Sequence, residues 1–104
     1  MEIIRGTTPQ IEVILENGTT FDSLGKVILR IKQGTLSIDK EPYSKDANFA
    51  LFKYTQEETI KLQEGKAEVQ LVGINENGEE TVSKTYCYEI QILKSLWNKV
   101  IHNE

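Results

Sequence analysis

Apolar and polar residues alternate through most of this chain, and the alternation breaks at residues that form tight turns. It is clearest in residues 66–92, where two alternating runs flank Asn77-Gly78. Asn-Gly is the preferred pair for a two-residue type I′ turn, because both central positions need a positive φ. The pattern therefore predicts a β-hairpin in which Glu76 faces Glu79.

That register decides which side chains share a face of the hairpin. It pairs Val69 with Tyr86 and Ala67 with Tyr88 on one face, and it leaves a mainly polar face opposite. The two tyrosines are interpreted as core or sheet-edge residues. Cys87 lies between them on the polar face, where a small strand residue is expected.

Earlier segments of the chain show the same period of two. Residues 11–15 alternate and end at Asn17-Gly18, which indicates a strand followed by a turn. Residues 27–38 predict a second hairpin that turns at Gly34. Residues 49–54 predict another strand, whose inward face the pattern leaves open.

One segment between the strands has helical signals instead. Residues 56–64 follow Thr55, and Glu58 stands where a capping box places its acidic residue. Gly65 supplies a stop. The core-facing residues of this short helix would be Ile60 and Leu62.

These elements together predict the fold class. Six to seven short strands with regular turn signals, and one crossover helix at about 56–64, favour an all-β fold. The expected architecture is an antiparallel immunoglobulin-like β-sandwich without the cysteine pair of antibody domains. At 104 residues, a single domain spanning 1–104 is expected.

The C-terminal segment changes to helical spacing. Apolar residues fall at i, i+3, i+4, i+7 and i+8, which predicts a short helix at about 95–102. This stripe consists of Leu93, Leu96, Trp97, Val100 and Ile101. A two-turn helix is not stable alone in water, so the stripe must be buried against something. Docking on the protein's own sheets and insertion into a groove of a neighbouring subunit both fit.

The charge balance argues against two classes of partner. The chain has 16 acidic and 12 basic residues, a net charge of −4, and its basic residues form no stripe. Nucleic-acid binding is not expected, because it needs a concentrated positive surface. A membrane span and a secretory signal peptide are not expected either, because the sequence has neither a long apolar run nor a basic start followed by one.

No residue pattern indicates catalysis, so we expect a protein that is not an enzyme. The single histidine, His102, lies three residues from the end, where rigid support is rare. Cys87 is the single cysteine and has no basic neighbour in sequence to activate it. The sequence predicts no catalytic residue, no metal ligand and no cofactor.

Several longer stretches resemble a known group of proteins. They are "IIRGTTPQIEVIL", "VILRIKQGTLSIDK" and "YTQEETIKLQEGKAEVQLVGINENGEETVSKTYCYEI", followed by a terminal helical segment. The pattern is similar to small immunoglobulin-like structural proteins of tailed phages and prophages of Gram-positive bacteria. It also resembles the N-terminal domain of phage baseplate upper proteins, although those continue into a long further region. The resemblance carries no catalytic residues.

The resemblance implies a structural or assembly protein of a phage particle, in baseplate, tail or head, that acts through protein–protein contacts. It would be found in the virion, or in the host cytoplasm during assembly. Its partners would be other virion or assembly proteins, or further copies of itself. The candidate partner-binding residues are Leu96, Trp97, Val100, Ile101, Ile3 and Ile4.

An alternative interpretation uses the loops of the sandwich. Loop residues at the end of such a fold are suited to binding a carbohydrate or a host protein. The candidates for this role are Pro42, Tyr43 and Asn48.

Overall fold

The computed structural model describes residues 1–16 and 18–94, and the predicted C-terminal helix lies outside these residues. The strands of the described part are β1 (Glu2–Ile4), β2 (Gln10–Ile14), β3 (Lys26–Gln33), β4 (Leu36–Lys40), β5 (Ser44–Lys45), β6 (Phe49–Lys53), β7 (Gly65–Ile74) and β8 (Glu80–Leu93). Its helices are α1 (Phe21–Leu24) and α2 (Gln56–Thr59).

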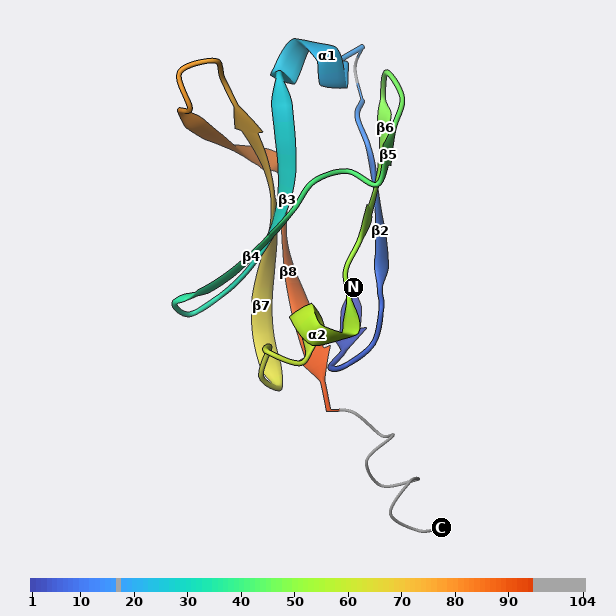
Figure 1. Ribbon diagram of the computed structural model, residues 1–104, viewed down its shortest axis with the longest axis vertical. Helices are drawn as coiled ribbons and strands as arrows, with labels where there is room; N and C mark the ends of the chain where they lie inside the picture. Colours follow the sequence, from blue (N-terminus) through green and yellow to red (C-terminus); the bar gives the residue numbers. More distant parts are fainter. Residues whose placement is uncertain (17, 95–104) are drawn as a thin grey trace, which may run out of the picture.

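The strands form two sheets that face each other (Figure 1). The five-stranded sheet has the order β1-β8-β7-β3-β4, and the three-stranded sheet has the order β2-β6-β5. All neighbouring strands are antiparallel except β1 and β8, which run parallel. The predicted all-β architecture with two layers is confirmed, whereas the prediction of purely antiparallel sheets is wrong for β1 and β8, and the described residues form eight strands instead of six to seven.

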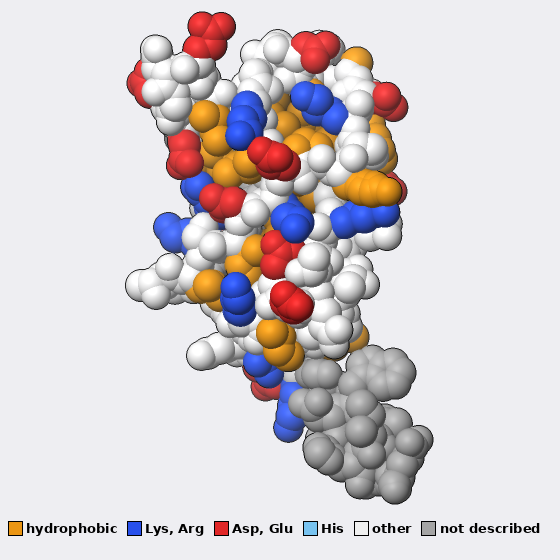
Figure 2. Space-filling view, viewed as in Figure 1, with side chains coloured by type: hydrophobic (Ala, Val, Ile, Leu, Met, Phe, Trp, Pro, Cys, Tyr) orange, Lys and Arg blue, Asp and Glu red, His pale blue; other side chains and the backbone are white. Residues whose placement is uncertain are grey.

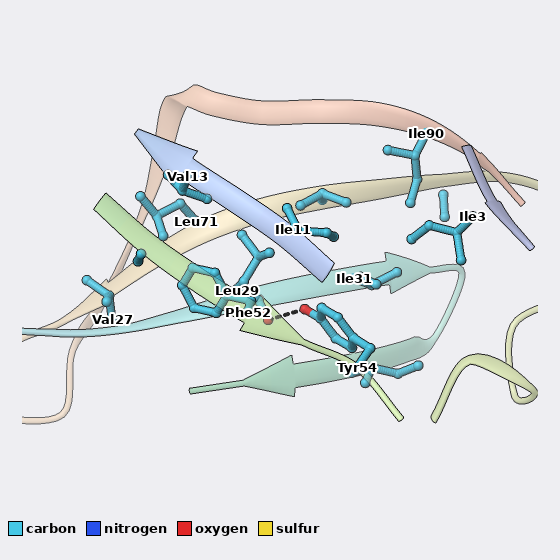
Figure 3. Close-up of a cluster of buried hydrophobic side chains, with 14 of the residues drawn as sticks. Ile3, Ile11, Val13, Val27, Leu29, Ile31, Phe52, Tyr54, Leu71 and Ile90 are labelled. Carbon is cyan, nitrogen blue, oxygen red and sulfur yellow. Dashed lines mark hydrogen bonds between the residues drawn. The ribbon is translucent and has the colours of Figure 1, made fainter. Parts of the chain in front are cut away.

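The core lies between the two sheets and follows the alternation of the sequence. Val27, Leu29 and Ile31 of β3 are buried, and so are Ile11 and Val13 of β2 (Figure 3). The predicted hairpin of β3 and β4 is confirmed, with Gly34 at positive φ in its turn.

The strand β6 has one buried and one half-buried face. Ala50, Phe52 and Tyr54 point into the core, whereas Phe49 and Leu51 point outward and are half-buried. Apolar residues on both faces explain why the sequence pattern leaves the inward face open. The Tyr54 hydroxyl donates a 2.7 Å hydrogen bond to the Leu29 carbonyl across the core (Figure 3).

The last hairpin forms as predicted, but its turn is different. Asn75 N–H donates to the Glu79 carbonyl and Gly78 N–H donates to the Asn75 carbonyl, each at 3.0 Å. The Asn75 side-chain oxygen also accepts from the backbone N–H groups of Asn77 and Glu79, each at 2.9 Å. This side chain stabilises a longer loop, so Ile74 pairs with Glu80 and the predicted pair Glu76–Glu79 is wrong.

A bulge in β8 shifts the register a second time. Residues 83–86 oppose the single residue Leu71, because Gln70 pairs with Cys87 while Val72 pairs with Val82. Beyond the bulge Val69 lies opposite Tyr88 instead of Tyr86. In the same way, Ala67 lies opposite Ile90 instead of Tyr88. The shifts at the turn and at the bulge together move the register by two residues from the predicted one, so Tyr86, Tyr88 and Ile90 keep their face and the pattern does not reveal the shift.

The crossover helix α2 is shorter than predicted. Its capping box is confirmed, since Glu58 N–H donates to Thr55 Oγ1 at 3.2 Å and Thr55 N–H donates to Glu58 Oε1 at 2.8 Å. After Thr59 the chain turns away, and Arg5 donates to the carbonyl of Ile60 at 2.8 Å. Leu62 is therefore buried, whereas Ile60 is 44% exposed and its predicted inward position is wrong.

Candidate functional site

The β2 edge of the three-stranded sheet has no partner strand in the described part of the chain. Strand β2 bonds to the β6 segment through alternate residues: Tyr54 N–H donates to the Pro9 carbonyl at 3.1 Å and Leu15 N–H to the Asn48 carbonyl at 2.8 Å. Because backbone groups alternate in direction along a strand, those of Gln10, Glu12 and Ile14 point away from β6. No strand of the described residues pairs with this edge.

Part of the β8 edge is open as well. Strand β1 covers its last residues, since Gln91 N–H donates to the Met1 carbonyl at 3.2 Å and Arg5 N–H donates to the Leu93 carbonyl at 3.0 Å. The same alternation directs the backbone groups of Cys87 and Glu89 toward this side. They lie beyond the reach of β1 in its register with β8.

Between these two edges lies a groove of about 330 Å³, which we call the edge groove. Its buried floor comes from both sheets and consists of Ile11, Val13, Leu29, Val69 and Ile90. Its rim consists of Met1, Glu12, Tyr86, Tyr88 and Glu89. Tyr88 is 55% exposed although it pairs with the buried Val69, which shows that the smaller sheet does not cover β8 here.

Tyr86 bounds the edge groove at one end. Its hydroxyl accepts a 2.9 Å hydrogen bond from Glu16 N–H, just past the end of β2. A second hollow of about 470 Å³ begins on the other side of Tyr86. It is lined by Leu15, Thr19, Ser23, Leu24, Leu71, Gly73, Asn75, Thr81, Ser83 and Tyr86 itself. Tyr86 thus connects the two sheets and separates an apolar groove from a hollow rich in hydroxyl groups.

The rim of the edge groove is acidic. The charged residues that line it are Glu12 and Glu89, both exposed glutamates. Glu89 lies 3.7 Å from Lys66, which offsets its charge, whereas Glu12 takes part in none of the ion pairs of the described residues. The groove therefore offers negative charge above an apolar floor.

Charged residues of the five-stranded sheet form ion pairs between its strands. Arg30 binds Asp39 at 2.8 Å and Glu80 at 3.0 Å, which links β3 to β4 and β8. The hydrogen bond from Arg30 holds the pKa of Asp39 below its usual range. On the face shown in Figure 2, Lys and Arg side chains alternate with Asp and Glu instead of forming a patch of one sign.

Cys87 is not activated by its surroundings. Burial, together with a hydrogen bond to Glu68 and the charge of that carboxylate, raises the pKa of the thiol above its usual value. The thiol is therefore protonated at neutral pH, which is unfavourable for a nucleophile.

The structure separates the candidate residues predicted at the chain ends. Ile3 is buried in the core, whereas Ile4 on the same strand is 37% exposed. Of this pair, Ile4 alone offers surface to a partner. Leu96, Trp97, Val100 and Ile101 lie outside the described residues.

The candidate loop residues do not form one site. Pro42 and Tyr43 precede β5 and line a shallow hollow of about 300 Å³, which Asn48 does not line. Asn48 belongs to the turn between β5 and β6, whereas Tyr43 N–H bonds to Leu51 farther along the hairpin. Lys53 Nζ lies 3.6 Å from the centre of the Tyr43 ring and occupies one of its faces.

Sequence reasoning did not find the edge groove. The sequence signal that could have indicated the groove is the two-residue spacing of Tyr86, Tyr88 and Ile90, which places them on one face of a strand. The open edge of β2 could not be read from that pattern, because it depends on β1 pairing with β8 instead of β2.

The described residues contain neither a cluster of metal ligands nor a membrane-spanning helix. Within residues 1–16 and 18–94, no three His, Cys, Asp or Glu side chains gather in a way that could hold a metal ion. No helix in the described part of the chain has the length and apolar character needed to cross a membrane. Comparison of the sequence with protein-family models and with curated proteins found no match.

Proposed function

We propose that this protein is a non-enzymatic structural or assembly protein of a phage or prophage particle, and that it binds neighbouring proteins through the open side of its two sheets. The observation that carries the proposal is the edge groove, where two strand edges without a partner in the described chain flank an apolar floor. Open edges and exposed apolar grooves are surfaces through which proteins associate. The phage setting is supported by the sequence resemblance to immunoglobulin-like phage structural proteins.

The strand order supports the finer assignment to the immunoglobulin type. If β1 to β8 are lettered A, B, C, C′, D, E, F and G, the sheets read A-G-F-C-C′ and B-E-D. Both sets match the grouping of strands in immunoglobulin sandwiches, except that the first strand lies beside G instead of B.

Mass spectrometry of particles tests the proposed function directly. Particles and assembly intermediates are purified from the bacterial strain that carries the gene, and the protein is quantified against a known coat protein. We expect a fixed ratio in particles or in intermediates. Absence of the protein from both would contradict the proposal.

The alternative is a carbohydrate- or host-protein-binding module. It is favoured by one observation: Tyr43 is 61% exposed and lies beside a hollow that also contains Lys26 and Lys45. If this function holds, the full chain stays an 11.9 kDa monomer at high concentration, and its aromatic fluorescence changes with purified cell-wall polysaccharide. Tyr43→Ala should then abolish the change, whereas Tyr88→Ala should leave it intact.

A further inference from the structure

The edge groove has the shape and polar groups that suit an extended chain. Gln10, Glu12 and Ile14 each present an N–H and a C=O on the open edge of β2, spaced as in an antiparallel ladder. The floor of the groove is apolar, so only a strand can use these backbone groups and fill the groove with every second side chain.

The strand order also indicates that the free edge of β2 could accept a further strand. In the constant-type immunoglobulin sandwich, the first strand lies beside the second. Here β1 pairs with β8 along residues 91–93, and no described strand pairs with the edge of β2 that faces away from β6. The position that another sandwich fills with its own strand is thus left for an added one.

We propose that the edge groove binds an extended segment of another protein, which adds to β2 as an antiparallel strand and carries apolar residues alternating with Lys or Arg. This inference rests on the proposed function and names the partner's chemistry. The apolar side chains enter the floor between Ile11, Val69 and Ile90, and Tyr88 packs along them. The basic side chains point outward, to the face on which Glu12 lies on the rim.

The dimensions set the length of the bound segment. Met1 lies at one end of the groove, and Tyr86 bounds the other. Strand β2 spans Gln10–Ile14, so the paired part of the segment is about five residues, or roughly 16 Å at 3.3 Å per residue.

A peptide selection tests the inference. The full chain is immobilised, random nonapeptides are selected on it, and the enriched peptides are sequenced and their dissociation constants measured. We expect enrichment of peptides with apolar residues at every second position and Lys or Arg between them. A peptide with the same composition but with its apolar residues consecutive should bind at least about tenfold more weakly.

The variant Glu12→Pro tests whether the peptide uses the β2 edge. Proline removes the Glu12 N–H, which faces the open side, and leaves the ladder to β6 intact, since proline is tolerated at such edge positions. We expect about tenfold weaker peptide binding than for Glu12→Gln, which lacks the same charge but keeps the N–H, at unchanged thermal stability. Glu76→Lys, an exposed change in the distant hairpin loop, should bind like the wild type.

Reversal of the rim charge tests the predicted specificity. In the variant Glu12→Lys, selection should favour Asp and Glu between the apolar positions instead of Lys and Arg. This result needs a folded protein, and it would not follow from a merely structural role of Glu12.

Three results would overturn the inference. They are enrichment of no alternating peptide, equal binding by Glu12→Pro and Glu12→Gln, and an unchanged preference in Glu12→Lys. If the selection fails while mass spectrometry finds the protein in particles, the assembly function stands and its contact lies elsewhere. If a second copy of this chain covers the groove at high concentration, the proposal that a segment of another protein occupies it is wrong.

Discussion

At the scale of single residues, the Tyr54 hydroxyl connects the two layers. It lies in the core and donates to the Leu29 carbonyl of the opposite sheet. Burial raises the pKa of Tyr54 far above its usual value near 10. The folded protein therefore keeps this proton at a pH where the unfolded chain releases it.

This difference predicts how stability depends on pH. Because the folded-state pKa is raised, the contribution of Tyr54 is fully present below about pH 10 and is lost as the pH rises above it. Urea unfolding of the wild type and Tyr54→Phe at several pH values measures this. Tyr54→Phe should cost about 1–2 kcal/mol at neutral pH, and the cost should shrink above pH 10. An equal loss of stability with pH in both proteins would contradict the assignment.

The residue scale also shows what the sequence could predict about capping and burial. The capping box at Thr55 and Glu58 is local, so the sequence was sufficient to predict it. The exposure of Ile60 was not predictable, because it depends on Arg5, a residue distant in sequence that binds the carbonyl of Ile60 where the chain leaves α2.

At the scale of elements, the loop between β7 and β8 shows how one side chain overrides a turn preference. Asn77-Gly78 favours a two-residue turn. The Asn75 side chain instead accepts two backbone N–H groups and stabilises a longer loop. Sequence reasoning therefore found the hairpin and missed its register.

A substitution at Asn75 measures this effect. Asn75→Ala removes the two hydrogen bonds that the side-chain oxygen accepts and the 3.3 Å one that its Nδ2 donates to Glu79, so we expect a loss of about 1 kcal/mol in the free energy of unfolding. Cross-strand contacts measured by NMR should then show Ile74 and Glu80 less firmly paired. Unchanged stability with intact pairing would mean that the Asn75 side chain does not hold the loop. Glu76→Ala serves as the control within the same loop.

At the scale of the whole molecule, the sequence predicted the two-layer fold because alternation reports directly on burial. Val27, Leu29 and Ile31 lie in the core as the pattern predicts. The candidate site was not predictable, because the pairing of β1 with β8 and the bulge at residues 83–86 depend on contacts between residues far apart in the sequence. These two features leave the β2 edge without a described partner strand and expose Tyr88.

Amide hydrogen exchange of the full chain, measured by NMR, tests the open edge of β2 most directly. Ile11 and Val13 N–H groups point to β6, whereas those of Gln10, Glu12 and Ile14 point to the open side. We predict slow exchange for the first two amides and fast exchange for the other three. Slow exchange of all five would show that the edge is already covered and would contradict the account.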